Sequence, residues 1–193
     1  MDRAELETHL KTMGPATIKN RSRVASLFID KPAYIGLLLE ILFESKKELC
    51  IKAAYTLELV CLEDITSLEP HLDIYTSNIQ HVTNGSAVRS LSKISSLLAI
   101  AYARNYPSTI RNRMNSQHIE LFIEAGFDWL ISEHKVAIKA HSMELLYQLG
   151  LEVDWVHGEL KLIIEKNMGY ESCGYQARGK KILGLINRSV IGY

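Results

Sequence analysis

Cysteine is scarce and unpaired in this chain of 193 residues, which has three cysteines and no CxxC pair. An odd number of isolated cysteines indicates neither a disulfide framework nor a zinc site. Cys50 and Cys61 are separated by about three turns of a helix, so they fall on one face of the same helix. Since a free cysteine behaves as a small apolar side chain, we expect both thiols to be buried.

No apolar run in the sequence is long enough to span a bilayer. The stretch 34-YIGLLLEILF-43 is interrupted by Glu40, whereas a transmembrane helix needs about 20 apolar residues. The N-terminus carries Asp2, Glu5 and Glu7 before any apolar run, which is the wrong charge for a signal peptide. We therefore expect a cytoplasmic protein with no membrane partner.

The motifs of common catalytic and cofactor sites are missing as well. The seven histidines include no HExxH motif and no pair at the i, i+4 spacing of a helical metal site. No GxxxxGKS/T, GxGxxG or GxSxG motif occurs, which leaves phosphate-loop, dinucleotide-binding and hydrolase functions without support. The sequence predicts a protein without enzymatic activity, with no metal and no cofactor.

Apolar residues at helical spacing, in contrast, occur along almost the whole chain. An apolar content of 47% and a charged content of 23% are typical of a soluble globular protein. The helical spacing is illustrated by two groups, Leu37, Leu38, Ile41 and Leu42, and Leu121, Phe122, Ala125 and Trp129. No segment shows the alternation of a strand, so the predicted fold class is all-α.

The periodicity predicts about ten helices, and the short connections between them imply antiparallel neighbours. They run near 2–13, 17–29, 31–44, 46–63, 67–82, 85–104, 116–132, 135–150, 152–168 and 172–189. The four prolines fall between these segments or in their first turns, where a missing N–H is harmless: Pro15, Pro32, Pro70 and Pro107. Asp30 and Ser67 have the position of N-caps.

One helix pattern recurs in the second member of successive pairs. The matching triplets are Ile51-Lys52-Ala53, Val88-Arg89-Ser90, Ile138-Lys139-Ala140 and Tyr175-Gln176-Ala177, whose first residues are spaced by 37, 50 and 37. A period in this range is typical of helical-pair repeats, because one pair cannot bury its apolar face alone. The small third residue of each triplet is expected to let adjacent helices approach closely.

On these triplets the chain resembles the HEAT/armadillo-like α-solenoids, in particular small bacterial members of that group. The resemblance implies a right-handed α-α superhelix of about five antiparallel helix pairs, forming one domain over 1–193. Residues 1–30 would be an atypical N-terminal pair and 31–189 the regular pairs, with a longer connection at 105–116. It also implies a concave wall, lined by the second helices, that binds a protein or a nucleic acid.

The charges are segregated along the chain although Lys+Arg and Asp+Glu both number 22. Residues 85–115 contain no acidic residue and five basic ones, namely Arg89, Lys93, Arg104, Arg111 and Arg113. Tyr102 and Tyr106 lie among them, and cations mixed with aromatic rings suit phosphate backbones and stacked bases. The segment is therefore either a contact for nucleic acid or an acidic peptide, or ordinary surface charge balanced by the neighbouring acidic repeats.

The second residues of the aligned triplets form another candidate site. Lys52, Arg89, Lys139 and Gln176 would project in register from the concave wall, roughly 10 Å apart, and could hold an acidic or extended ligand. Alternatively, the long side chains cover apolar surface with their stems.

Three functions follow from these observations. The first is a non-enzymatic scaffold that binds a macromolecular partner, above all a protein, on its concave face through Lys52, Arg89 and Lys139. The alternative is a nucleic-acid-binding repeat protein that uses the basic segment 85–115. A third hypothesis is a glycosylase, by a remote resemblance to the DNA alkylation-repair helical-repeat proteins. Two observations disfavour the glycosylase hypothesis. The spacing of Trp129 and Trp155 places them in the core, and the aligned second helices offer no inward aspartate.

Overall fold

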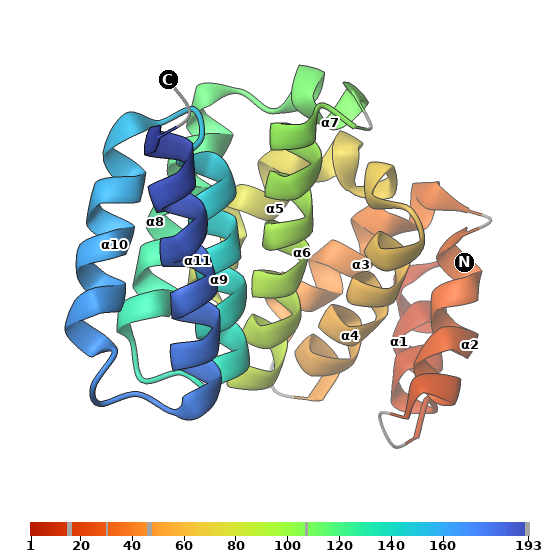
Figure 1. The fold of residues 1–193 in the computed structure, drawn as a ribbon. Helices are drawn as coiled ribbons and strands as arrows, with labels where there is room; N and C mark the ends of the chain where they lie inside the picture. Colours follow the sequence, from red (N-terminus) through yellow and green to blue (C-terminus); the bar gives the residue numbers. More distant parts are fainter. Residues whose placement is uncertain (15–16, 30, 46–47, 107, 192–193) are drawn as a thin grey trace. The chain divides into compact units, whose positions relative to one another are not determined.

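The computed structural model describes residues 1–14, 17–29, 31–45, 48–106 and 108–191, and these divide between two compact units (Figure 1). Unit 1 is Met1–Ile94 and unit 2 is Ser95–Tyr193, so the boundary falls inside helix α6 (Gly85–Arg104). Within the described ranges every regular element is helical, which confirms the all-α class. The single repeat domain expected over 1–193 stays a prediction.

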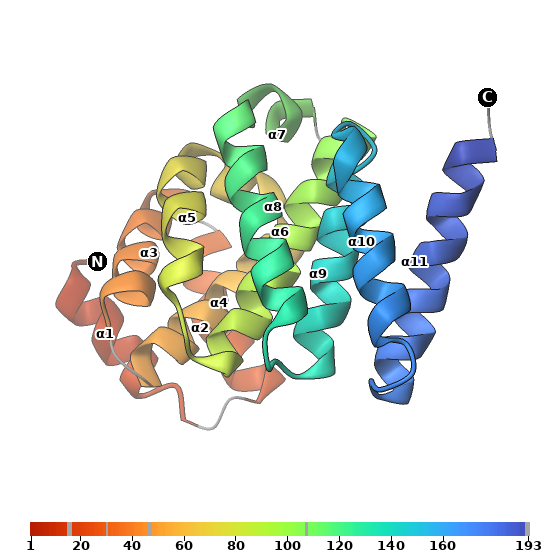
Figure 2. The same ribbon diagram turned by 90° about the vertical axis from the view of Figure 1, so that its left-hand side faces the viewer.

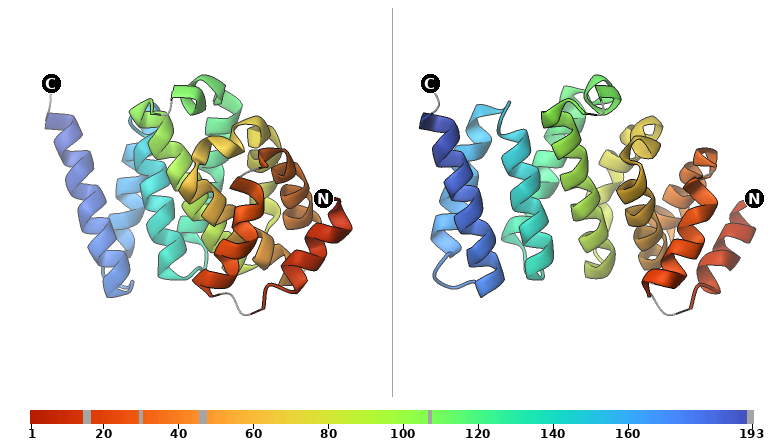
Figure 3. Two further views of the ribbon diagram at one scale, coloured as in Figure 1. Left: turned by 90° about the vertical axis from the view of Figure 1, so that its right-hand side faces the viewer. Right: turned by 45° about the vertical axis from the view of Figure 1, so that its right-hand side comes forward.

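The described residues of unit 1 form five further α-helices and three 3-10 helices. They are α1 (Arg3–Lys11), α2 (Ile18–Ile29), η1 (Pro32–Tyr34), α3 (Ile35–Glu44), α4 (Glu48–Glu63), η2 (Ile65–His71), α5 (Leu72–Asn78) and η3 (Ile79–His81). Helix α3 packs against α1 and α5, while α4 packs against α2 and against its own hairpin partner α3 (Figure 3). First helices thus contact first helices and second helices contact second helices, which is the two-layered packing expected of helix pairs.

Unit 2 repeats this layering. It contains the end of α6 and five helices, α7 (Ser108–Arg113), α8 (Ser116–Ile131), α9 (Val136–Leu149), α10 (Asp154–Asn167) and α11 (Cys173–Ile191). Helix α8 packs against α10 in one layer and α9 against α11 in the other, and hairpin partners close the two layers together (Figure 2).

The predicted apolar stripes form the core of both units. Leu38, Ile41 and Leu42 are buried in α3, and Phe122 and Trp129 in α8, as their spacing predicted. Their burial supplies the main stabilisation of each helix, because an isolated helix of this length is marginal in water.

The two cysteines of α4 are both buried, which confirms their prediction. Burial raises the pKa of the Cys50 thiol, and burial also raises that of Cys61, where the nearby carboxylates of Asp64 and Glu58 add to the effect. Neither thiol is therefore poised as a nucleophile. Cys173, at the start of α11, is exposed.

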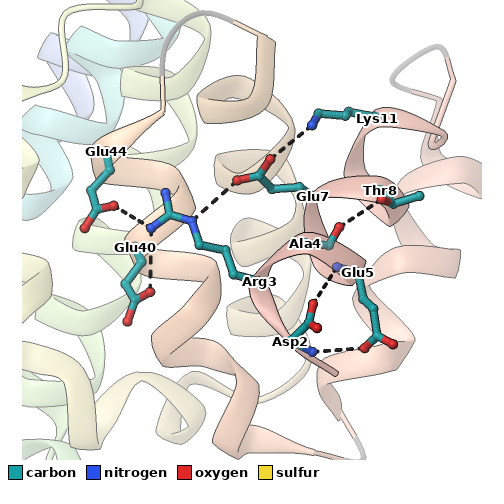
Figure 4. A network of polar contacts seen from close by, with 9 residues as sticks. All are labelled: Asp2, Arg3, Ala4, Glu5, Glu7, Thr8, Lys11, Glu40 and Glu44. Carbon is teal, nitrogen blue, oxygen red and sulfur yellow. Dashed lines mark hydrogen bonds and ion pairs between the residues drawn. The ribbon is translucent and has the colours of Figure 1, made fainter.

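Helix α1 is capped and then fastened to α3 by charged side chains (Figure 4). Asp2 and Glu5 form a capping box, in which the Asp2 carboxylate accepts from the Glu5 amide at 2.8 Å. The Arg3 guanidinium lies 2.6 Å from the Glu44 carboxylate and 3.9 Å from that of Glu40, both on α3. These contacts orient α1 on the layer of first helices.

Two expected features differ in the structure. The segment near 67–82 is not one helix but the succession η2, α5 and η3, and the N-cap of η2 is Asp64 rather than Ser67. Asp64 accepts from the amide of Thr66 at 2.9 Å, and Pro70 lies within η2, where it interrupts regular helix geometry. Asp30, Pro15 and Pro107 lie outside the described residues.

The small residues of the aligned triplets share the predicted packing role only in part. Ala53 and Ser90 are fully buried in unit 1. In unit 2, Ala140 is half-buried and Ala177 exposed, and both line a shallow hollow between α9 and α11. Small side chains open a surface depression there instead of closing an interface.

A tight contact of α11 in unit 2 involves a glycine, which generates a stability prediction. A Cβ at Gly179 on α11 would lie 2.8 Å from Ile164 Cγ2 and 3.0 Å from Met168 Cε, whereas a Cβ at Gly184 would meet nothing within 4 Å. We expect Gly179→Ala to lower the free energy of unfolding by about 1–2 kcal/mol through overpacking. The control Gly184→Ala should raise it by about 0.5–1 kcal/mol, because alanine is the better helix former. Urea unfolding measures both, and equal stabilisation of the two variants would contradict this packing.

Candidate functional site

Lys52, the first residue of the expected ladder, is nearly buried in unit 1. Its ammonium donates to the carbonyl of Lys11, the last residue of α1, at 3.1 Å and lies 2.7 Å from the Glu48 carboxylate. A cation at a helix C-terminus interacts favourably with the helix dipole. The Lys52 charge therefore joins α1 to α4.

The buried carboxylate of Glu58 on α4 contacts basic side chains from the first half of α6. The Glu58 carboxylate accepts from the Ser90 hydroxyl at 2.5 Å and from the Lys93 ammonium at 3.0 Å. The Arg89 guanidinium lies 3.8 Å away. Burial opposes ionisation of Glu58, but these hydrogen bonds and positive charges outweigh it and hold its pKa below the ordinary value.

In unit 2 the remaining ladder residues, Lys139 on α9 and Gln176 on α11, both contact Glu171 in the turn before α11. The Lys139 ammonium pairs with the Glu171 carboxylate, and the Gln176 amide donates to the Glu171 carbonyl at 2.9 Å. Arg178 pairs with Glu144 at 2.9 Å. Each charged ladder residue is thus bound to a glutamate of its own unit. The common register of the four stays a prediction, because two of them belong to each unit.

Arg111 of the basic segment is likewise engaged within unit 2. Its guanidinium lies 2.6 Å from the Glu152 carboxylate, donates to the Tyr102 carbonyl at 3.1 Å and stacks over the Tyr102 ring at 4.7 Å. Hydrogen bonding by Arg111 lowers the pKa of Glu152, whereas burial, followed by the Glu152 charge, raises the pKa of Tyr102. The cluster fixes α7, a short helix that the sequence pattern did not predict, within the connection 105–116.

Arg104, Tyr106 and Arg113 of the basic segment are exposed, as is Arg89, which lies near Glu58. Asn105 adopts a left-handed conformation with φ of 50°, and the amides of Asn105 and Tyr106 bond to the carbonyls of Tyr102 and Ala101. This Schellman arrangement ends α6 and directs Tyr106 outward, 82% exposed. Neither Arg104 nor Arg113 forms an ion pair with any residue that the structure describes.

A groove of unit 2, in the layer that α8 and α10 form, has a mostly apolar lining. It has a volume of about 480 Å³ and runs between α8 and the start of α10. Its lining residues are Ser116, Ile119, Glu120, Ile123, Glu124, Phe127, Val153 and Trp155. The apolar residues of α8 recur every fourth position, so they form one stripe along the helix.

Trp155 forms one side of this groove and is 58% exposed, which corrects the prediction that it belongs to the core. Its indole stacks on the Phe127 ring, with centroids 5.8 Å apart and planes inclined by 20°. The buried stripe of α10 consists instead of Val156, Leu160 and Ile164, and a step of one residue turns Trp155 about 100° away from it. This stripe was the sequence signal that could have shown Trp155 to be outside the core.

Further apolar surface continues from the groove along α10. Leu162, two turns beyond Trp155, is 62% exposed, and Leu151 in the preceding turn is also exposed. Exposed aromatic and aliphatic side chains that gather around a groove are typical of interaction sites. The sequence analysis assigned no site to α8 or α10.

A larger hollow, of about 770 Å³, lies on α1 and α2 in unit 1. Its polar groups contact each other: the Met1 ammonium donates to the Tyr34 hydroxyl at 3.1 Å, which lowers the pKa of Tyr34, and Lys31 lies 5.8 Å from the Tyr34 ring. It lacks the apolar lining with a few convergent polar groups that characterises ligand pockets.

The described part of the chain contains neither a metal-binding cluster nor a membrane-spanning helix. No group of three or more His, Cys, Asp or Glu side chains there is placed to hold a metal ion. No described helix combines the length and the apolar character that crossing a bilayer requires. The candidate surfaces are thus the α8–α10 groove and the exposed residues at the end of α6 and in α7.

The chain matches no family model, no curated protein and no solved structure. The packed helices are compatible with a helical-repeat fold, and the likeness to HEAT and armadillo-like proteins stays a prediction. The assignment of the α8–α10 groove as a candidate site rests on its side-chain geometry.

The Glu58 cluster leads to a prediction of pH-dependent stability. Because the pKa of Glu58 is lower in the folded chain than in the unfolded chain, its stabilisation is fully present above about pH 4.3 and is lost as the pH falls through the lower folded value. We expect Glu58→Gln to lower the free energy of unfolding by about 1–3 kcal/mol at pH 7, with the difference from the wild type shrinking in acid.

The matched control is Glu165→Gln, which removes an exposed carboxylate that lies 3.9 Å from Lys161. It should change stability by less than about 0.5 kcal/mol at any pH. Urea unfolding between pH 3 and pH 7 measures the three proteins. A constant difference between Glu58→Gln and the wild type over this range would show that Glu58 is not held ionised.

Proposed function

We propose that the chain is a non-enzymatic scaffold of HEAT/armadillo-like design, a superhelical array of about five helix pairs that binds a protein partner. The observation that carries the proposal is the α8–α10 groove with the exposed indole of Trp155 at its side. Tryptophan is among the residues that dominate the energy of protein interfaces, and it does so in apolar surroundings.

The charged ladder residues are engaged inside the molecule, which leaves the groove as the surface for the partner. Lys52, Arg89 and Lys139 are each bound to a glutamate within their own unit, so their use by a partner would require breaking these pairs. Removing one member of a partly buried pair leaves the other charge without compensation. We therefore assign these residues to internal cohesion and the partner to the groove.

A photocrosslinking amino acid at Glu124, on the rim of the groove, tests this proposal in the cells that produce the protein. We expect a discrete crosslinked protein that is lost when Trp155→Ala is added, because the indole is the main contact. The same amino acid at the exposed Lys180 of α11 is the control and should not yield that product. A product that forms at both positions, or that survives Trp155→Ala, would place the partner elsewhere.

Nucleic-acid binding is the second candidate, and it is favoured by one observation. Tyr106 is 82% exposed just after α6, between Arg104 at the end of α6 and Arg113 at the end of α7, two exposed arginines without an ion pair to any described residue. An exposed aromatic ring can stack on a base while cations contact phosphates. Arg89, Lys93 and Arg111 would take no part in this contact, because they are held by Glu58 and Glu152.

Anisotropy of labelled single- and double-stranded DNA and RNA at low and near-physiological salt tests this candidate. If it holds, the double variant Arg104→Glu/Arg113→Glu should bind weakly and should lower the slope of log K against log salt by about 1 for each lost phosphate contact. The control Lys180→Glu/Lys181→Glu makes the same charge change on α11 and should bind as the wild type does. No binding at low salt, or equal loss in both variants, would remove this candidate.

A further inference from the structure

A row of three carboxylates lines the rim of the α8–α10 groove. Glu120, Glu124 and Asp128 recur every fourth residue of α8, next to the apolar stripe of Ile119, Ile123 and Phe127. All three carboxylates are exposed, and α8 contains no lysine and no arginine. The groove thus pairs an apolar floor with an acidic edge.

These carboxylates have no internal cation, in contrast to those of the polar clusters. Among the described residues, none of the three forms an ion pair, whereas Glu58, Glu144, Glu152 and Glu171 all do. Like charges four residues apart on a helix destabilise it by about 0.2–0.5 kcal/mol for each pair. A positively charged partner would relieve this repulsion, so the charge of the rim favours a basic occupant.

The indole of Trp155 adds a second preference for positive charge. One side of the ring stacks on Phe127, and the remaining surface is open to solvent. The face of a tryptophan ring is the best acceptor of a cation–π interaction, above all with arginine. An arginine or lysine of the partner could therefore lie over the indole while its neighbours reach Glu120 and Glu124.

The length of the apolar stripe fits a helical occupant. From Ile119 to Phe127 the rise along α8 is about 12 Å, at 1.5 Å for each residue. Apolar side chains at positions i, i+3 or i+4, and i+7 of a partner helix span about 10.5 Å, so three of them match the stripe. Such anchors are the pattern by which an amphipathic helix occupies an apolar groove.

We propose that the α8–α10 groove binds a basic amphipathic helix of another protein, with three apolar anchors on the Ile119–Phe127 stripe and lysine or arginine side chains on Glu120, Glu124 and Trp155. The inference rests on the proposed protein-binding function and narrows it to one class of partner. The chain as a whole has a formal net charge of zero, so attraction of a basic helix must come from this local rim.

The probes are three labelled helical peptides that share the same apolar residues at i, i+4 and i+7. They differ at one fixed set of polar positions, which are all lysine in the first peptide, all glutamine in the second and all glutamate in the third. Anisotropy with the full chain measures their affinities. We expect the lysine peptide to bind at least tenfold more tightly than the glutamate peptide, with an affinity that falls as salt rises. Trp155→Ala should weaken the binding of the lysine peptide by at least tenfold.

The charge variants isolate the contribution of the rim. Glu120→Gln/Glu124→Gln should weaken the lysine peptide by roughly fivefold to twentyfold and leave the glutamine peptide unchanged. The control Glu133→Gln/Glu165→Gln removes two exposed carboxylates of unit 2 outside the groove and should change neither affinity by more than about twofold. Far-ultraviolet circular dichroism of each variant confirms that it is folded.

Three results would overturn the inference. Equal binding of the three peptides that is lost with Trp155→Ala would leave the groove a protein-binding site without charge preference, and the proposed function would stand. If none of the peptides bound although the crosslink at position 124 still depended on Trp155, the groove would bind a protein that is not a basic helix, and the proposed function would again stand. Sedimentation that shows a dimer, dissociated by Trp155→Ala, would make a second copy of the chain the occupant instead.

Discussion

Burial of one apolar stripe for each helix is the constraint on which the structure depends. Most of the described helices are too short to be stable alone, so each must cover its stripe with a neighbour in its own layer and with its hairpin partner. This requirement explains why the same triplet recurs along the chain. It also bears on the groove, because Ile119 and Phe127 of α8 are only partly buried and flank the buried Ile123 on its floor. An interaction surface arises where the packing of the layer is incomplete.

Electrostatic pairing reinforces this packing and engages part of the charge that the sequence segregates. Basic residues of 85–115 and 171–193 meet glutamates that come from the acidic stretches, as Arg111 meets Glu152 and Arg178 meets Glu144. For these residues the structure favours the interpretation of local charge balance over that of a ligand site. The buried case is Glu58, which accepts from two donors and lies near the Arg89 guanidinium, and the loss of one partner there is costly because the carboxylate is shielded from water.

The sequence predicted those features that repeat with a helical period, and it missed those that depend on a single turn. The helices near 85–104, 116–132 and 135–150 lie within one or two residues of their expected ends, because long periodic stripes define them. Helix α7 is too short to show a period. Trp155 was misplaced because spacing cannot distinguish two adjacent faces in the first turn of a helix, where one residue of phase separates the buried stripe from the surface. The ion pairs were out of reach of the sequence, since the partners of Glu58 and Lys139 are more than 30 residues away.

The combination of an apolar floor with a row of exposed carboxylates is what distinguishes the groove. A surface that carried only exposed apolar side chains would bind many apolar segments weakly, and an acidic row alone would be a solvated helix face. Together they discriminate, because a partner must supply apolar anchors and positive charge at matching positions, and an acidic or neutral segment leaves the rim carboxylates either repelled or uncompensated. Trp155 joins the two requirements in one side chain, since its ring adds apolar contact area and also accepts a cation. Specificity at this site would therefore come from the rim, and most of the affinity from the indole and the stripe beside it.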